Sequence, residues 1–308
     1  MPIVQTDIPI TAQSCDQMIQ QITRTYPFCR SELLATTAFQ RPIRTLVIGT
    51  GPRKVIYSAS HHANEWITSL VLLKFAEELA SAISENGRIG GEDARRIAET
   101  ATIYMVPMVD PDGVDLVVGA IEPGQIQYET ARRLADNYPS IPFPNGWKAN
   151  LLGVDLNLQY PAGWLQAREI KFSEGFTRPG PRDYVGRAPL GQIESRALAG
   201  YTEVIDPELV LAYHSQGEVI YWQFQDYEVP GARELGEEFA RVSGYALEEV
   251  PFESSFAGYK DWFIQKFRRP GYTIEVGEGE NPLPLNQFDE IYRNNLGILT
   301  TATLGLPE

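Results

Sequence analysis

Histidine and cysteine are both scarce in this chain, and their scarcity limits the chemistry that it can perform. Three histidines occur among 308 residues: His61 and His62, which are adjacent, and His214. Any imidazole-dependent chemistry therefore has only these three candidates. The two cysteines, Cys15 and Cys29, are too few for a disulfide framework, which is typical of proteins from a reducing compartment.

Basic charge and long apolar runs are lacking as well. The chain has 26 lysines and arginines against 40 aspartates and glutamates, which gives a formal net charge of −14 at pH 7. This acidity excludes a nucleic-acid partner and attraction to an anionic membrane. No apolar run approaches the roughly 18 residues of a transmembrane helix, and the N-terminus lacks the basic start and apolar core of a signal peptide. We therefore expect a cytoplasmic protein.

The apolar pattern predicts strands that alternate with helices. Helices are expected over 13–26, from Leu72 to Leu79, over 229–244 and 258–269, and around 288–299; strands are expected as a pair within 31–50 and over 54–60, 101–109, 209–213, 219–223 and 272–276. This order predicts an α/β sandwich, with a mixed, mostly parallel, twisted sheet and helices on both faces. Residues 1–308 are expected to form a single domain, on which the helix and strand pair of residues 1–50 pack.

Two segments predict irregular structure. The sequence Asp110-Pro111-Asp112-Gly113 is a turn signal after the strand over 101–109. The stretch 138–190 is rich in proline, glycine and tryptophan, which predicts long loops, and long loops in compact domains are usually functional or disordered.

All three histidines follow predicted strands, at the carboxyl ends where open α/β sheets place their ligand sites. His62 and Glu65 are three residues apart at a strand-to-helix turn, so they project from one face. With His214 they would form a two-histidine, one-glutamate set, which is a known catalytic zinc arrangement. The spacing leaves a second pair open, because His61 and Glu65 are four residues apart.

Glu275 lies within the apolar segment Tyr272–Val276, where a carboxylate without a partner would be costly. Hydrolysis at a zinc site also needs a base to accept a proton from water, normally a carboxylate. Glu275 is therefore either this base or a solvent-facing residue of an edge strand.

Five segments in order resemble the zinc carboxypeptidase family, over most of the chain from about Arg44 to about Gln287. These segments are Ser60-His-His-Ala-Asn-Glu-Trp-Ile67, Asp110-Pro-Asp-Gly113, Gly153-Val-Asp-Leu-Asn157, Tyr213-His-Ser215 and Tyr272-Thr-Ile-Glu275. The resemblance implies a single catalytic zinc peptidase domain that binds one zinc ion through His62, Glu65 and His214. It leaves His61 as a neighbour.

The resemblance also implies roles for residues around the metal. Asp155 would accept a hydrogen bond from His62 and fix its tautomer. Asn157 would bind a substrate carboxylate, and Glu275 would act as the general base and later as proton donor. A zinc-activated water would attack a peptide carbonyl, with a positive charge nearby to stabilise the oxyanion.

The chain departs from digestive carboxypeptidases at positions that contact substrate. Asn64 and Leu158 stand where those enzymes usually have arginine, so their arginine clamp for a C-terminal carboxylate is incomplete. Lys148 follows Trp147 where they have arginine, and it would stabilise the oxyanion as a point charge.

These departures resemble the bacterial γ-D-glutamyl-meso-diaminopimelate peptidases, through the segments His61–Trp66, Trp147–Asn150, Gly258–Trp262 and Gly277–Pro282. The resemblance implies hydrolysis of the γ-D-Glu–diaminopimelate bond in peptidoglycan stem peptides. Asn64, Asn157 and Lys260 are the candidate substrate-binding residues. Such a substrate is anionic, so its pocket should be locally cationic; the loop arginines Arg178, Arg182 and Arg187 are further candidates for that patch.

Two alternatives remain open. A related zinc deacylase of N-acyl amino acids, of the desuccinylase and aspartoacylase kind, would share the fold and a His-x-Asn-Glu segment, although Trp66 and the glutamate strand argue against it. A zinc- or peptide-binding module without catalysis would have no need of Glu275. The sequence leaves the length of the stem peptide, exo- or endo-cleavage and the oligomeric state undetermined.

Overall fold

The computed structural model describes residues 2–306 and is built on one eight-stranded sheet. The strand order is β1-β2-β6-β3-β7-β10-β8-β9. The strands are β1 (Arg30–Thr36), β2 (Pro42–Ile48), β3 (Arg53–Ala59), β6 (Ala101–Val106), β7 (Leu209–His214), β8 (Val219–Tyr221), β9 (Ala246–Glu248) and β10 (Gly271–Glu275). The four central strands β6, β3, β7 and β10 are mutually parallel, while β1, β2 and β8 join by antiparallel pairs. The predicted mixed, mostly parallel sheet is therefore confirmed.

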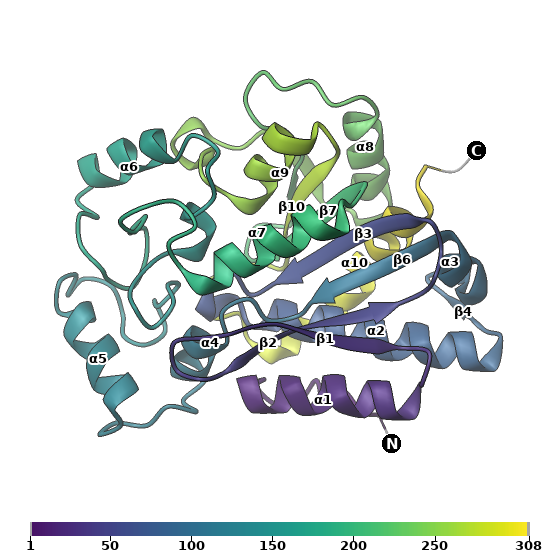
Figure 1. Cartoon of the computed structure of the whole chain (residues 1–308), viewed down its shortest axis with the longest axis horizontal. Helices are drawn as coiled ribbons and strands as arrows, with labels where there is room; N and C mark the ends of the chain where they lie inside the picture. The colour runs from purple at the N-terminus through teal and green to yellow at the C-terminus, as the bar shows by residue number, and fades with distance from the viewer. Residues whose placement is uncertain (1, 307–308) are drawn as a thin grey trace.

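Helices cover both faces of this sheet (Figure 1). They are α1 (Ala12–Thr25), α2 (Ile67–Glu85), α3 (Ala94–Thr100), α4 (Pro111–Val117), α5 (Ile126–Ala135), α6 (Trp164–Ser173), α7 (Ile193–Ile205), α8 (Ala232–Ser243), α9 (Tyr259–Phe267) and α10 (Phe288–Leu304). In Figure 1, α7 crosses in front of the sheet and α10 lies behind it. A two-stranded ribbon, β4 (Arg88–Ile89) and β5 (Glu92–Asp93), connects α2 to α3.

The central strands are buried on both faces, which explains their continuous apolar runs. In β3, Val55 and Tyr57 belong to the core under α1, α2, α8 and α10, whereas Ile56 belongs to the core under α7 and α9. Successive side chains of a strand point to opposite faces, so this one short segment contributes to both cores.

The predicted turn at 110–113 is wrong, because these residues begin α4. The Asp110 side chain accepts a hydrogen bond of 3.0 Å from the Gly113 backbone N–H, and Pro111 occupies the first turn. An aspartate before a proline at a helix start satisfies a free N–H and presets the backbone angle, so the same residues serve a helix as well as a turn.

The predicted loops over 138–190 contain one helix that the apolar pattern did not indicate. Helix α6 buries only Trp164 and Ala167, too few residues to form an apolar stripe. The patterning likewise did not identify α3, α5, α7 or the short strand β9. No helix within residues 2–306 combines the length and apolarity required to cross a bilayer.

Candidate active site

The site lies where two neighbouring parallel strands end. Strand β3 pairs with β7 in a register that places Ala59 opposite Tyr213, so the residues that follow both strands emerge at one edge of the sheet. After β3 the chain passes His62 in extended conformation and enters a single 3-10 turn, η1 (Ala63–Glu65). This turn brings the Glu65 side chain back over His62, and β7 ends on His214.

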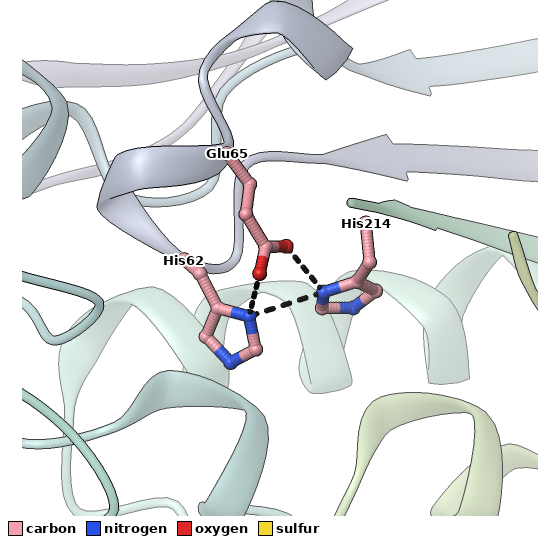
Figure 2. A group of neighbouring side chains, drawn as sticks. All are labelled: His62, Glu65 and His214. Atoms are coloured by element: carbon pink, nitrogen blue, oxygen red, sulfur yellow. Dashed lines mark hydrogen bonds and ion pairs between the residues drawn. The ribbon is translucent and has the colours of Figure 1, made fainter. Parts of the chain in front are cut away.

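Three side chains converge at this edge (Figure 2). His62 Nδ1 lies 2.9 Å from Glu65 Oε1, His214 Nδ1 lies 2.9 Å from Glu65 Oε2, and the two Nδ1 atoms are 3.2 Å apart. One ligand atom from each residue falls within 4.8 Å of the others. Glu65 and His214 are almost fully buried, and His62 is slightly exposed.

This donor set fits zinc. Two imidazole nitrogens and a carboxylate are the ligands of hydrolytic zinc sites. The lone pairs of the two ring nitrogens and the negative charge of the carboxylate lie close together, so the set attracts a cation. His62, Glu65 and His214 would hold the ion.

Asp155 fixes the orientation of His62 from the other side of its ring. Its Oδ1 lies 3.2 Å from His62 Nε2, and its carboxylate also accepts backbone hydrogen bonds from Asn157 and Asp183. A proton on Nε2 leaves Nδ1 free as a metal ligand, so Asp155 has the contacts needed to select that tautomer.

Neighbouring charges in the site oppose the effect of burial on the pKa values of Glu65 and His62. Burial alone would raise the pKa of Glu65, but His62 and Lys148 hold it well below its usual range. Burial would lower the pKa of His62, but Glu65 and Asp155 raise it to about 9. These opposing charges are typical of a position where carboxylates and imidazoles surround a cation.

His61 does not join this group. Its Nε2 lies 3.1 Å from the Tyr160 hydroxyl, and its ring stacks on those of His214 and Tyr259 at centroid distances of 5.6 Å. His61 is fully buried and supports the ring of a candidate ligand instead of facing the metal position.

Glu275 stands beside His214 on an interior strand. The parallel pairing of β10 with β7 sets Glu275 opposite His214, and β8 covers the other side of β10. The alternative of a solvent-facing glutamate on an edge strand is therefore wrong. Burial, with the negative charge of Glu65, raises the pKa of Glu275 to about 8.

A cavity of about 270 Å³ opens beside the three convergent side chains, and His62 is the one of them that lines it. The predicted site residues that line it are His62, Lys148, Asp155, Asn157, Lys260 and Glu275. Lys148 Nζ lies 3.1 Å from Glu65 Oε1, and Asn157 Oδ1 accepts a hydrogen bond from the Tyr259 backbone. Lys260 is nearly buried and forms an ion pair of 2.6 Å with Asp261.

Asn64 is the predicted substrate-binding residue that does not line this cavity. It is buried, and its Nδ2 donates to the Asn145 carbonyl at 3.1 Å. Because the 3-10 turn directs Glu65 into the site, the neighbouring Asn64 points to the loop that carries Asn145.

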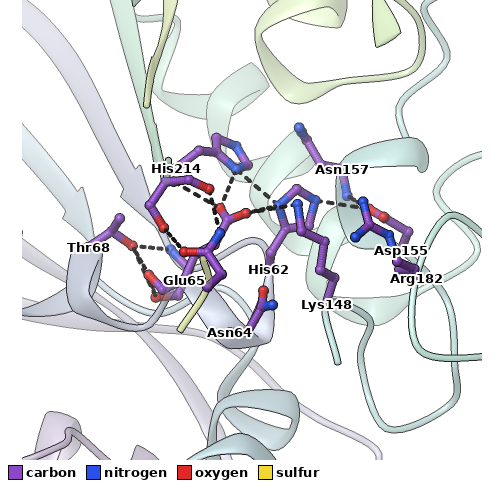
Figure 3. A network of polar contacts seen from close by, with 12 residues as sticks. His62, Asn64, Glu65, Thr68, Lys148, Asp155, Asn157, Arg182 and His214 are labelled. Atoms are coloured by element: carbon purple, nitrogen blue, oxygen red, sulfur yellow. Dashed lines mark hydrogen bonds and ion pairs between the residues drawn. The ribbon is translucent and has the colours of Figure 1, made fainter. Parts of the chain in front are cut away.

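Two of the four cationic residues that line the cavity, Lys171 and Arg182, have no specific role predicted from the sequence. Of the three loop arginines, Arg182 lines the cavity, whereas Arg178 and Arg187 are exposed outside it. Lys171, on α6, also lines the cavity, and no sequence signal distinguishes it from a surface lysine. Figure 3 shows Arg182 beside Asp155 in the polar network around His62.

A mixed α/β sheet that brings two histidines, a glutamate and a separate carboxylate to one edge defines a zinc-dependent hydrolase class. Comparison with known proteins identifies the family: the model of the zinc carboxypeptidases matches residues 15–297, so the chain belongs to the zinc carboxypeptidase family. The chain is a peptidase hydrolase of that family.

Two curated relatives cover most of the chain. The chain is 43% identical to gamma-D-glutamyl-L-diamino acid endopeptidase 1 of Lysinibacillus sphaericus over 280 residues, 91% of this chain and 68% of that protein. It is 37% identical to the uncharacterized protein YqgT of Bacillus subtilis (strain 168), over 93% of this chain and 75% of that protein.

Solved structures share the fold at low sequence identity. Carboxypeptidase A from Helicoverpa armigera superposes with a TM-score of 0.73 at 17% identity, over 99% of this chain and 76% of that chain. Murein-tripeptide amidase MpaA from Escherichia coli O157 gives a TM-score of 0.53 at 18% identity, over 88% of this chain and 91% of that chain. The predicted carboxypeptidase-like fold is thereby confirmed.

Proposed function

We propose that this chain hydrolyses the bond between γ-D-glutamate and a diamino acid, most simply diaminopimelate, in peptidoglycan stem peptides. The observation that carries the proposal is the placement of Glu275 beside a His62–Glu65–His214 set in a cavity lined by four cationic side chains. The similarity to a gamma-D-glutamyl-L-diamino acid endopeptidase supports the choice of bond.

One zinc ion held by His62, Glu65 and His214 would supply a Lewis acid that polarises the scissile carbonyl and lowers the pKa of water. Glu275 is the general base: its carboxylate accepts a proton from the attacking water and returns it to the leaving nitrogen. Asp155 keeps the Nε2 proton of His62 in place during these steps.

Lys148 provides the positive charge nearest the metal ligands. Burial alone would lower its pKa, but Glu65 raises it, so the ammonium stays charged. It would stabilise the oxyanion that forms as water adds to the carbonyl, and it does so with one charge centre where arginine offers two parallel donors.

Product masses test this function directly. The zinc-loaded chain is incubated with L-Ala-γ-D-Glu-meso-diaminopimelate, with the same peptide containing L-Lys as the third residue, and with N-acyl amino acids. We expect L-Ala-D-Glu and the free diamino acid from the stem peptides. Cleavage of the N-acyl amino acids alone would instead identify a zinc deacylase, and loss of the L-Ala residue would place the cut at the wrong bond.

A further inference from the structure

The cavity beside the candidate zinc site is lined by four cationic side chains, and they differ in how far neighbouring carboxylates already engage them. Three are held in ion pairs by their terminal nitrogens: Lys148 with Glu65, Lys171 with Glu174 and Asp183, and Lys260 with Asp261. Each of these ammonium groups already shares its charge with a carboxylate, and each is a point charge that cannot offer a second anion two parallel donors.

Arg182 is the exception. Its Nε lies 2.6 Å from Asp183 Oδ2, but within residues 2–306 neither Nη1 nor Nη2 forms a hydrogen bond or an ion pair. The side chain is 41% exposed and lines the cavity. Asp183 therefore orients the guanidinium by one edge and leaves its two terminal nitrogens available, which is the geometry for a bidentate contact with a carboxylate.

The backbone around Arg182 is fastened to the site on both sides. The Pro181 carbonyl accepts hydrogen bonds from the backbone N–H groups of Lys148 and Ala149, at 2.7 and 2.9 Å. On the other side, the Asp183 N–H donates to Asp155 Oδ2 at 3.3 Å. Arg182 therefore lies between Pro181, which is hydrogen-bonded to the Lys148 segment, and Asp183, which is hydrogen-bonded to Asp155.

This anchoring continues along the same loop. The Tyr184 carbonyl accepts from the Asp155 N–H at 2.9 Å, and the Gly180 N–H donates to the Gly153 carbonyl at 3.0 Å. These hydrogen bonds fix the backbone of the loop, and a fixed backbone reduces the entropy lost when the side chain binds a ligand. Asn157, which follows Asp155 by two residues, lines the same cavity. Its Oδ1 accepts a hydrogen bond from the Tyr259 N–H, and its Nδ2 donates to no other residue among 2–306.

We infer that Arg182 binds a carboxylate of the substrate through Nη1 and Nη2 and thereby determines specificity for acidic γ-glutamyl peptides. The inference rests on the proposed function, whose substrate carries a free α-carboxylate on D-glutamate and one or two carboxylates on the diamino acid. Arg182 is not required for the chemistry at the scissile bond; it selects and orients the ligand.

Four matched peptides identify the carboxylate. The parent is L-Ala-γ-D-Glu-meso-diaminopimelate; the second has the D-glutamate α-carboxylate as an amide, the third has the α-carboxylate of diaminopimelate as an amide, and the fourth has L-Lys in place of diaminopimelate. For the parent we expect Arg182→Met to lower kcat/KM by about 10- to 100-fold, mainly through KM, and Arg182→Lys to recover part of the loss. For the one peptide that lacks the contacted carboxylate, the loss should be under about threefold.

Arg178→Met is the matched control, because Arg178 belongs to the same loop but is exposed outside the cavity. It should leave all four peptides unchanged. An equal loss for all four peptides in Arg182→Met would overturn the inference and assign Arg182 a structural role, while their cleavage would leave the proposed function intact.

Binding measurements separate the two proposals. Calorimetric titration of the four peptides into zinc-loaded Glu275→Gln protein, with and without Arg182→Met, measures recognition without turnover. If only N-acyl amino acids are hydrolysed but peptide affinity still depends on Arg182 and one carboxylate, the proposed function fails and the role of Arg182 stands. If no peptide is bound or cleaved, both are refuted.

Discussion

Ser215 and Asn281 bind each other through two reciprocal hydrogen bonds of 2.7 Å. Ser215 Oγ donates to Asn281 Oδ1, and Asn281 Nδ2 donates to the Ser215 carbonyl. Ser215 directly follows His214, and its N–H lies 3.3 Å from Glu65 Oε2. The loop after β10 therefore holds the backbone that presents one candidate zinc ligand and contacts another.

Asn281→Ala should weaken zinc binding by about tenfold and lower the free energy of unfolding by about 1–3 kcal/mol, because both reciprocal bonds are lost. A competition titration against a fluorescent zinc chelator and urea unfolding measure the two effects. Ser215→Ala, which removes one of the two bonds, should have about half the effect. Unchanged zinc affinity in Asn281→Ala would mean that the loop does not position His214.

Glu275→Gln should keep its zinc and lose kcat by about two to four orders of magnitude, because glutamine cannot accept a proton from water. Elemental analysis and steady-state kinetics on the parent stem peptide check both parts. Glu278→Gln, an exposed residue on the following loop, is the control and should retain full activity. Survival of activity in Glu275→Gln would assign the base to another residue.

Removal of zinc should lower thermal stability as well as abolish activity. A ligand present at 100 times its Kd stabilises the folded state by about 2.7 kcal/mol, so chelation should lower Tm by several degrees. Elemental analysis after zinc supplementation should give one ion per chain, none in His214→Ala, and one in His61→Gln, since His61 contacts Tyr160 instead of the metal position. Zinc retained by His214→Ala would contradict the ligand set.

Glu194 should make stability depend on pH. Burial raises the pKa of Glu194 to about 6, above the usual range of a glutamate, so folding favours the protonated form. The contribution of Glu194 to the free energy of unfolding is complete below about pH 4.5 and is lost as the pH rises through about 6. The free energy of unfolding changes by about 2 kcal/mol over this range. Glu194→Gln should remove this dependence and be more stable than the parent at pH 8.

Urea unfolding of the parent and of Glu194→Gln between pH 4 and pH 8 measures the difference between their free energies of unfolding. Glu99→Gln, an exposed position on α3, provides the control and should follow the parent chain at every pH. A constant difference between parent and Glu194→Gln would show that Glu194 does not titrate in this range.

The sequence predicted two features correctly: a mixed, mostly parallel sheet, and the placement of the histidines at its carboxyl edge. Both depend on local signals. Continuous apolar runs mark buried parallel strands, and a histidine directly after such a run must emerge at the carboxyl edge. The contact of Asp155 with His62 was predicted through the family resemblance alone. The position of Arg182 depends on backbone hydrogen bonds between segments near 148–155 and 180–184, which leave no periodic pattern in a loop rich in proline and glycine.

Asn64 illustrates a second limit. Motif position suggested substrate contact, yet rotation through one 3-10 turn sends its side chain to the Asn145 carbonyl. Neighbouring residues of a tight turn diverge widely in direction, so sequence proximity to a ligand does not establish which way a side chain points.

The candidate ligands come from distant parts of the chain: His62 and Glu65 follow β3, and His214 ends β7, which lies beside β3 in the sheet although about half of the chain separates the two strands. No fragment that ends before β7 can assemble the set. Parallel pairing of this kind closes long loops and is slow to form. Metal binding by this set would therefore report the pairing of β3 with β7. Because Glu275 ends β10, later still in the chain, a nascent chain would gain the proposed general base only after this pairing.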